Sequence, residues 1–286
     1  MKTIIYLLIA IILFGCIATC ETKKTAPKEN SIVIETVDKG ISDDLLNESA
    51  EIIAKRLKSF SKEDFNIEVN EEDNQIIILY SGKPEMSFIK KLIVQKGNFG
   101  FYETYGQDSL AILLNDTNKL FSLLKTNPGN NSASIAGCVT VSEVAAIDEY
   151  LFTVKIENCK FAWTKPGTYQ EVCLYALKTC KNNIGVIRNS GIKSIKYARD
   201  KVSGGHGIEI SLKKPEAEKW AEVTKLNLNR AVAIVLDGEV ICAPVVKSVI
   251  SGGNCSITGD FSENEMLYIV AMAGNSMLPA DFEIVE

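Results

Sequence analysis

The sequence is poor in the residues on which catalytic and metal sites most often depend. It contains one histidine, His206, inside a glycine-rich stretch, and no two cysteines are separated by two residues. A Cys/His or Ser/His/Asp constellation, a zinc ribbon and a thioredoxin-like redox site all need more than this. The Gly252-Gly253 pair also lacks the lysine and the strand-to-helix context of a phosphate loop. We therefore expect no enzyme, no metal and no cofactor, and we interpret His206 as part of a turn between two strands.

Runs of basic residues are also missing. The chain has 31 Lys and Arg against 36 Asp and Glu, a net charge of −5. Neutralising nucleic-acid phosphates needs clustered cations, so we expect no nucleic-acid partner. Hydrophobic residues make up 46% of the 286 residues and charged residues 23%. This globular composition is long enough to form one large or two modest domains with a buried core.

The N-terminus carries an apolar run from Ile4 to Phe14. The run is shorter than the roughly 20 residues that a membrane-spanning helix needs, and it predicts a signal peptide over residues 1–15. Leu13-Phe14-Gly15-Cys16 resembles a bacterial lipobox, which predicts that Cys16 is lipidated and becomes the mature N-terminus. Cys20 is a second candidate for lipidation, and a short uncleaved anchor is the alternative interpretation. The polar residues 16–30 are expected to form a tether.

Residues 31–105 alternate between strand and helix patterns in the order βαββαβ. Strands are expected at Ser31–Val37, Phe65–Asn70, Ile76–Tyr80 and from Phe99, with helices after Ser42 and from Pro84. The first helix has apolar residues on one face and Lys55, Arg56 and Lys58 in its last turn, where the macrodipole favours cations. Two helices on one face of a four-stranded sheet form a ferredoxin-like arrangement.

Residues 106–190 are the least regular part of the chain. Helices are expected near Leu110–Leu114 and Leu120–Leu124, and 143–150 forms a short segment of ambiguous type. Leu151–Trp163 and Glu171–Leu177 predict a hairpin around Lys165-Pro166-Gly167.

The pattern becomes regular again in residues 191–274. A strand through Ile208 and Leu212 precedes a helix that buries Trp220. Two turns follow, at Asp237-Gly238 and at Gly252-Gly253, and the first is a strong hairpin signal because both residues tolerate positive φ. Ser262 with Glu265 three residues later predicts a capped helix that ends at Gly274.

Six cysteines remain beyond the N-terminal pair. They are Cys138, Cys159, Cys173, Cys180, Cys242 and Cys255. An exported chain meets an oxidising compartment, so an even set indicates disulfides, although many pairings are possible. The alternative is that several of them are small buried hydrophobic residues.

Several ordered motifs resemble the first periplasmic domain of the SecD protein-export family. They are Leu236-Asp237-Gly238-Glu239-Val240-Ile241-Cys242-Ala243-Pro244, residues 250–253 and 257–262, the ending 278–286, and Gln95-Lys96-Gly97-Asn98-Phe99-Gly100-Phe101-Tyr102-Glu103. Phe161-Ala162-Trp163 and Leu174-Tyr175-Ala176-Leu177 are similar to the longer head of SecDF proteins from Bacteroidetes-type bacteria. One departure is that 28–40 lacks the Asp-Leu-Arg-Gly-Gly-like element that opens this domain in SecD.

The resemblance implies an α+β fold with two parts. A ferredoxin-like base over 31–105 would carry an inserted head over 106–274, of which 191–274 is the core and 106–190 a less readable insertion. Residues 275–286 would return as a strand to the base sheet, because apolar and acidic residues alternate there.

The resemblance also implies a function. We expect a lipid-anchored envelope protein facing the periplasm of a Gram-negative, Bacteroidetes-like bacterium. It would bind exported unfolded polypeptides beside the Sec translocon or a full-length SecDF, without the proton-coupled membrane domain. The alternative is a structural envelope lipoprotein that binds one fixed protein partner.

Overall fold

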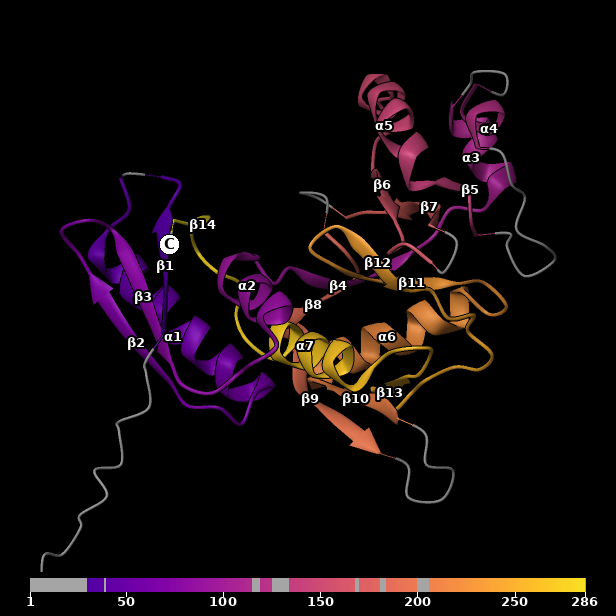
Figure 1. The fold of residues 1–286 in the computed structure, drawn as a ribbon. Helices are drawn as coiled ribbons and strands as arrows, with labels where there is room; N and C mark the ends of the chain where they lie inside the picture. The colour runs from indigo at the N-terminus through magenta and orange to yellow at the C-terminus, as the bar shows by residue number, and fades with distance from the viewer. Residues whose placement is uncertain are drawn as a thin grey trace, which may run out of the picture.

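The computed structural model describes residues 30–38, 40–114, 119–124, 134–167, 170–180, 184–199 and 206–285. The predicted signal peptide, Cys16, Cys20 and nearly all of the tether lie outside the described residues. Figure 1 shows two lobes, which we call the base and the head, with helix α7 between them.

The base is a four-stranded antiparallel sheet with two helices. Its elements are β1 (Asn30–Thr36), α1 (Asp43–Phe60), β2 (Phe65–Asn70), β3 (Gln75–Tyr80), α2 (Met86–Val94) and β14 (Phe282–Ile284), and its strand order is β14-β1-β3-β2. Ser42 caps α1, where its hydroxyl accepts a hydrogen bond from the Leu45 N–H at 3.4 Å. Apolar residues on β1, β3 and one face of each helix form the core. The α+β class is therefore as predicted.

The fourth strand of the base sheet is not the one expected from the order of elements. Strand β4 (Phe99–Glu103) was predicted to complete this sheet, but it pairs with β11 (Val232–Leu236) in the head. The prediction of β4 in the base is wrong, and β14 lies beside β1 instead, with Ile34 opposite Ile284 and Thr36 opposite Phe282. The physical reason is burial: residues 99–102 of β4 are all buried, which suits an inner strand covered on both faces.

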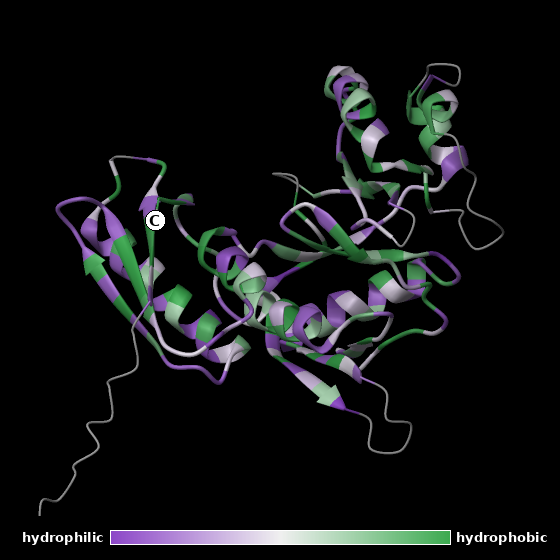
Figure 2. Cartoon of the chain, viewed as in Figure 1, coloured by the Kyte–Doolittle hydropathy of each residue, from purple (hydrophilic) through white to green (hydrophobic). Residues whose placement is uncertain are grey.

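The head contains two more sheets and two helices. Its other elements are β8 (Ile187–Arg188), β9 (Ile192–Arg199), β10 (His206–Leu212), α6 (Lys214–Leu226), β12 (Glu239–Cys242), β13 (Asn254–Ile257) and α7 (Glu263–Ala273), arranged as β12-β11-β4-β8 and β13-β10-β9. Strand β11 is buried along its whole length and is green throughout in Figure 2. It is therefore an inner strand, as its continuous apolar run predicts.

The insertion forms a small layer on the head. It consists of α3 (Gln107–Leu114), α4 (Lys119–Leu123), β5 (Gly137–Thr140), α5 (Val144–Thr153), β6 (Cys159–Trp163) and β7 (Glu171–Lys178), with sheet order β5-β7-β6. The helices pack on one face of this sheet, and Tyr175 and Leu177 pack with Ala233 and Val235 on the other. The predicted hairpin of β6 and β7 is present, but its first strand begins only at Cys159 because residues up to Thr153 belong to α5.

The pairing of β14 with β1 leads to a testable difference between two neighbouring residues. Phe282 is 6% exposed and packs in the core, whereas Ile284 is 37% exposed. We expect Phe282→Ala to lower the free energy of unfolding by about 3 kcal/mol, and Ile284→Ala, the matched control, by less than about 1 kcal/mol. Urea unfolding of both variants measures this. Equal losses would contradict the burial of Phe282 on the core-facing side of the returning strand β14.

Candidate functional site

The chain crosses between base and head twice, and the two crossings touch. Residues 95–98 lead out from α2 to β4, and residues 274–281 lead back from α7 to β14. The Leu278 N–H donates to the Lys96 carbonyl at 2.9 Å, and the Lys96 ammonium lies 3.0 Å from the Asp281 carboxylate. We call this pair of segments the junction.

Arg56 of α1 holds both crossings of the junction. Its side chain is fully buried. One guanidinium nitrogen donates to the carbonyls of Leu92 at 3.2 Å and Gln95 at 2.7 Å. The other donates to the carbonyls of Lys96 at 2.6 Å and Ser276 at 3.0 Å. A planar guanidinium presents its N–H donors in a fixed fork. The Arg56 side chain, which belongs to the base lobe, therefore binds both the outgoing and the returning segment.

The buried position of Arg56 differs from the sequence prediction, which grouped it with the cations of the last helical turn. A signal was available in the spacing. Arg56 lies three residues after Ile53 and four before Phe60, both buried, so it falls within the apolar stripe of α1. Burial lowers the pKa of the guanidinium from its ordinary value to about 10, while the charge of Asp237 opposes the shift. Arg56 therefore remains a cation at neutral pH.

The predicted turn at Asp237-Gly238 is part of the same junction. Both residues have positive φ, 49° and 89°, as the hairpin between β11 and β12 requires. The Asp237 carboxylate accepts hydrogen bonds from the N–H groups of Gly97 at 3.0 Å and Asn98 at 2.7 Å. The turn residue therefore also fixes the outgoing segment to the head.

Asn189 ties the head to both crossings. Its side-chain oxygen accepts from the Phe99 N–H at 2.9 Å, and its amide donates to the carbonyls of Gly97 at 2.9 Å and Asn275 at 3.3 Å. Neither Asn189 nor Arg56 was singled out as a site residue from the sequence. Their partners are backbone groups distant in sequence, which no side-chain pattern reveals.

The second predicted turn has a packing role. Gly253 has a φ of 65°, and a Cβ at this position would lie 2.4 Å from the Cβ of Ala217 on α6. Only glycine fits this approach. A positive φ is found at Gly253 but not at Gly252.

A pocket of about 320 Å³ lies in the head between β11, β13 and the segment 244–250. We call it the head pocket. Apolar side chains line most of it, among them Phe101, Trp220 and Ile234. Trp220 is 4% exposed, its ring lies 5.0 Å from that of Phe101, and its indole N–H has no hydrogen-bond partner among the described residues. A buried, unpaired donor in an apolar pocket could pair with an acceptor on a bound molecule.

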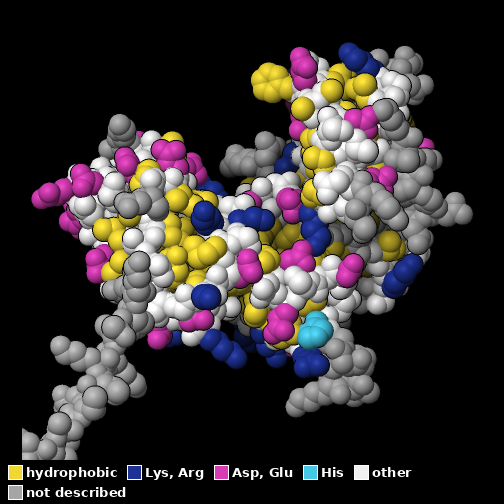
Figure 3. Space-filling view, viewed as in Figure 1, with side chains coloured by type: hydrophobic (Ala, Val, Ile, Leu, Met, Phe, Trp, Pro, Cys, Tyr) yellow, Lys and Arg dark blue, Asp and Glu magenta, His cyan; other side chains and the backbone are white. Residues whose placement is uncertain are grey.

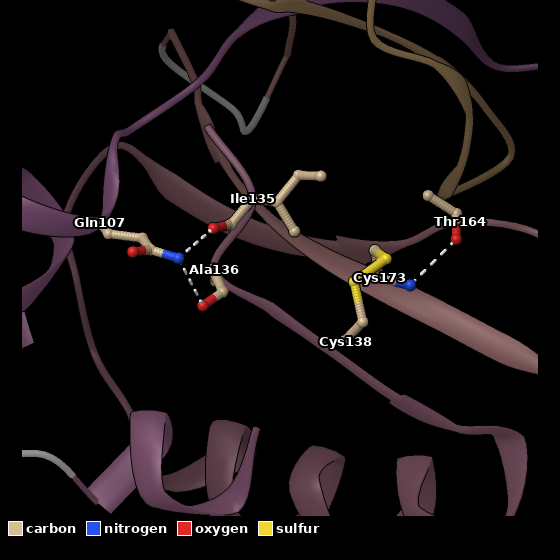
Figure 4. The surroundings of a disulfide bond; sticks show 6 residues. All are labelled: Gln107, Ile135, Ala136, Cys138, Thr164 and Cys173. Atoms are coloured by element: carbon tan, nitrogen blue, oxygen red, sulfur yellow. Dashed lines mark hydrogen bonds between the residues drawn. A yellow bond between two sulfur atoms is a disulfide. The ribbon is translucent and has the colours of Figure 1, made fainter. Parts of the chain in front are cut away.

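The structure pairs two of the six cysteine candidates. Cys138 on β5 and Cys173 on β7 lie directly opposite each other in the antiparallel ladder and form a disulfide that closes a separation of 35 residues. Figure 4 shows the bond beside Thr164, whose hydroxyl accepts a hydrogen bond from the Cys173 N–H at 3.0 Å. Figure 4 also shows Gln107, whose side-chain amide donates to the Ile135 carbonyl at 2.9 Å.

The other four candidates are thiols. Cys159 lies opposite Lys178, Cys242 opposite Ile234 and Cys255 opposite Ile210, so no second cysteine faces them across a strand. Burial raises the pKa of the Cys242 thiol to about 12 and the pKa values of Cys159 and Cys255 to about 11. The fourth thiol, Cys180, is exposed.

His206 is the first residue of β10 rather than part of a turn, and its ring contacts Tyr197 through a hydrogen bond to the phenol oxygen. In the described part of the chain, no three His, Cys, Asp or Glu side chains come together as metal ligands would. None of the described helices has the length and apolar content needed to cross a bilayer.

Comparison with known families gives a match in the head. The family model for the SecDF P1 head subdomain matches residues 177–280, which include most of the head pocket. The chain is 34% identical over 101 residues to the protein translocase subunit SecD of Acidaminococcus fermentans, covering 35% of this chain and 24% of the relative. It is 43% identical over 72 residues to SecD of Syntrophobacter fumaroxidans, covering 24% and 13%. The chain thus matches about a quarter or less of the length of these two relatives.

Solved structures show a similar fold. SecDF, described as a membrane component that enhances protein export, has a chain that superposes with a TM-score of 0.52 at 18% identity, covering 90% of this chain and 98% of the other. SecDF in a super-membrane-facing form superposes with a TM-score of 0.55 at 18% identity, covering 90% and 29%.

The described chain thus consists of an α+β base that carries an inserted head, joined through two crossing segments. The match of residues 177–280 and the shared fold support a relationship between this chain and the SecD/SecDF periplasmic domain family.

The cysteine assignments lead to a labelling prediction. The thiolate is the form that reacts with alkylating agents, so a raised pKa and burial both slow the reaction. With iodoacetamide at pH 8 and no reductant, we expect Cys180 to be labelled at least tenfold faster than Cys159, Cys242 or Cys255, and Cys138 and Cys173 to be unlabelled. Peptide mass spectrometry over a time course measures this. Rapid labelling of Cys138, or a disulfide joining any of the other four, would contradict the assignment.

Proposed function

We propose that this protein is an accessory of Sec-dependent protein translocation that binds exported polypeptides in its head. The match of residues 177–280 to the SecDF P1 head subdomain supports a role in protein translocation. The observation that carries polypeptide binding is the head pocket, where an apolar surface and an unpaired indole donor lie next to a strand edge.

The edge in question belongs to β13. This strand ends the sheet β13-β10-β9, and within the described residues no further strand pairs with its outer side. Four β13 residues, Asn254 to Ile257, line the head pocket. An extended client segment could pair its main chain with this edge, insert an apolar side chain into the pocket and offer a carbonyl to Trp220. Main-chain pairing carries little sequence information, so binding should be broad and weak.

The same proposal implies where in the cell the protein acts. A head that binds exported chains must lie on the periplasmic face of the inner membrane, beside the translocon or a full-length SecDF. Lipidation of Cys16 would hold it there, and the mass of the mature N-terminal peptide tests that step. An unmodified chain that starts at Met1, or one lipidated at Cys20, would exclude Cys16 as the anchor.

The test of client binding is site-specific photocrosslinking in cells that hold an exported protein arrested during translocation. Probes replace Lys247 and Ser256 at the head pocket, and control probes replace the exposed Lys90 and Lys225 elsewhere. We expect crosslinks to the arrested chain from the pocket positions only. If one folded envelope protein is captured repeatedly and the arrested chain never is, the protein binds a fixed partner and the translocation proposal fails.

A variant separates client binding from folding. Trp220→Phe keeps an aromatic ring in the core but removes the indole N–H. Because that donor has no partner among the residues that the structure describes, its loss removes no hydrogen bond seen in the fold. A hydrogen bond is worth about 1 kcal/mol, so we expect about a fivefold loss of client crosslinking. The smaller ring leaves a cavity and lowers the thermal transition, so crosslinking is measured at a temperature where the variant is fully folded. Unchanged crosslinking would show that the indole N–H does not contact clients.

A further inference from the structure

A second cavity lies on another side of the molecule, where the base meets the head. It has a volume of about 590 Å³. Ser59 at the end of α1 forms part of its wall, and β9, the end of α7 and the returning segment 274–277 form most of the rest. We call it the junction cleft. Apart from Asn189 and the residues 274–277, its lining has no part in the interactions described above.

The described lining of the junction cleft carries three cations and no carboxylate. Arg188, Lys193 and Lys213 line it, all three are exposed, and none forms an ion pair with a described carboxylate. Among the described residues that line it, none is Asp or Glu. The whole chain has more carboxylates than cations, so this separation of charge is local. Figure 3 shows Lys and Arg side chains along the lower edge of the molecule in this view, between the base and the strands of the head.

The remaining lining residues suit an amphiphilic anion. Ser190 and Ser194 supply hydroxyl groups next to the cations, and Ile192, Ile195 and Met277 supply an apolar wall. Guanidinium and ammonium groups with hydroxyl donors are the usual protein ligands of phosphate, and a concave site concentrates their field. A free phosphate would use only the polar part of this lining, whereas a phosphate attached to an apolar body would use both.

We propose that the junction cleft binds a phosphate-bearing anion, and that the headgroup of an anionic phospholipid fits it better than free phosphate. The cleft is separate from the head pocket, so this proposal does not depend on client binding.

The test uses the full chain in a neutral detergent and three soluble probes. These are dihexanoyl phosphatidylglycerol, dihexanoyl phosphatidylcholine and inorganic phosphate, with affinities from calorimetry and contact sites from hydrogen exchange. We expect phosphatidylglycerol to bind at least tenfold more tightly than either other probe and to slow exchange of the amides of residues 190–195. Affinity should fall as salt is raised, because exposed charges are screened.

Two matched variants decide whether the cleft is the site. The cleft variant removes the three cations of the cleft through Arg188→Gln, Lys193→Gln and Lys213→Gln. The control variant removes the same charge at exposed positions elsewhere through Lys83→Gln, Lys90→Gln and Lys225→Gln. We expect the first to weaken phosphatidylglycerol binding at least tenfold and the second less than twofold, with both thermal transitions unchanged.

Each other outcome has a definite meaning. Equal binding of inorganic phosphate and phosphatidylglycerol, lost in the cleft variant, would retain the anion site and reject the lipid source. Equal weakening by both variants would show that binding depends on net charge alone. If neither phosphatidylglycerol nor inorganic phosphate binds, the cleft is not an anion site. Either of these last two results would overturn the proposal.

Discussion

The arrangement of the two lobes depends on one buried cation. Arg56 belongs to the base, yet it donates to carbonyls of both segments through which the chain enters and leaves the head. A buried charge is costly unless it is hydrogen-bonded, and four backbone carbonyls accept from the two terminal nitrogens here, while Nε has no partner among the described residues. Gly97 allows the approach, because a Cβ there would lie 2.3 Å from a guanidinium nitrogen. The crossings therefore cannot separate without leaving the cation unpaired.

Side chains of the head also form hydrogen bonds with the backbone of the junction. Asp237 and Asn189 of the head both form hydrogen bonds with the outgoing segment, through Gly97 and Asn98. Asp237 lies at the end of β11, and residues Val232 and Ile234 of the same strand line the head pocket. The proposed client site is thus built on the strand whose turn is fixed at the junction. The junction cleft is lined by residues 274–277 of the returning segment, so both proposed sites lie next to elements that the junction holds in place.

Local structure was predictable from the sequence where neighbouring residues determine it. The Ser42 cap, the Ser262–Glu265 capping box, the Asp237-Gly238 hairpin and the amphipathic face of α1 all follow from short spacings, and the structure contains each of them. The place of β4 was not predictable, since a buried apolar strand suits any covered sheet. Cys138 and Cys173 could not be chosen as a pair before their strands were in register. The cleft cations are scattered in the sequence, and only the fold brings Arg188 close to Lys213.

Substitution of Arg56 tests the central claim, that one guanidinium joins the two crossings. Arg56→Met removes the donors, and each buried carbonyl left unpaired costs about 1–3 kcal/mol, whereas Lys58→Met removes an exposed cation two residues away as a control. Hydrogen exchange of the Leu278 N–H, which bonds to the Lys96 carbonyl, reports the contact between the crossings directly. The account predicts that Arg56→Met speeds this exchange at least tenfold while Lys58→Met leaves it unchanged. Equal exchange in Arg56→Met and the parent protein would contradict it.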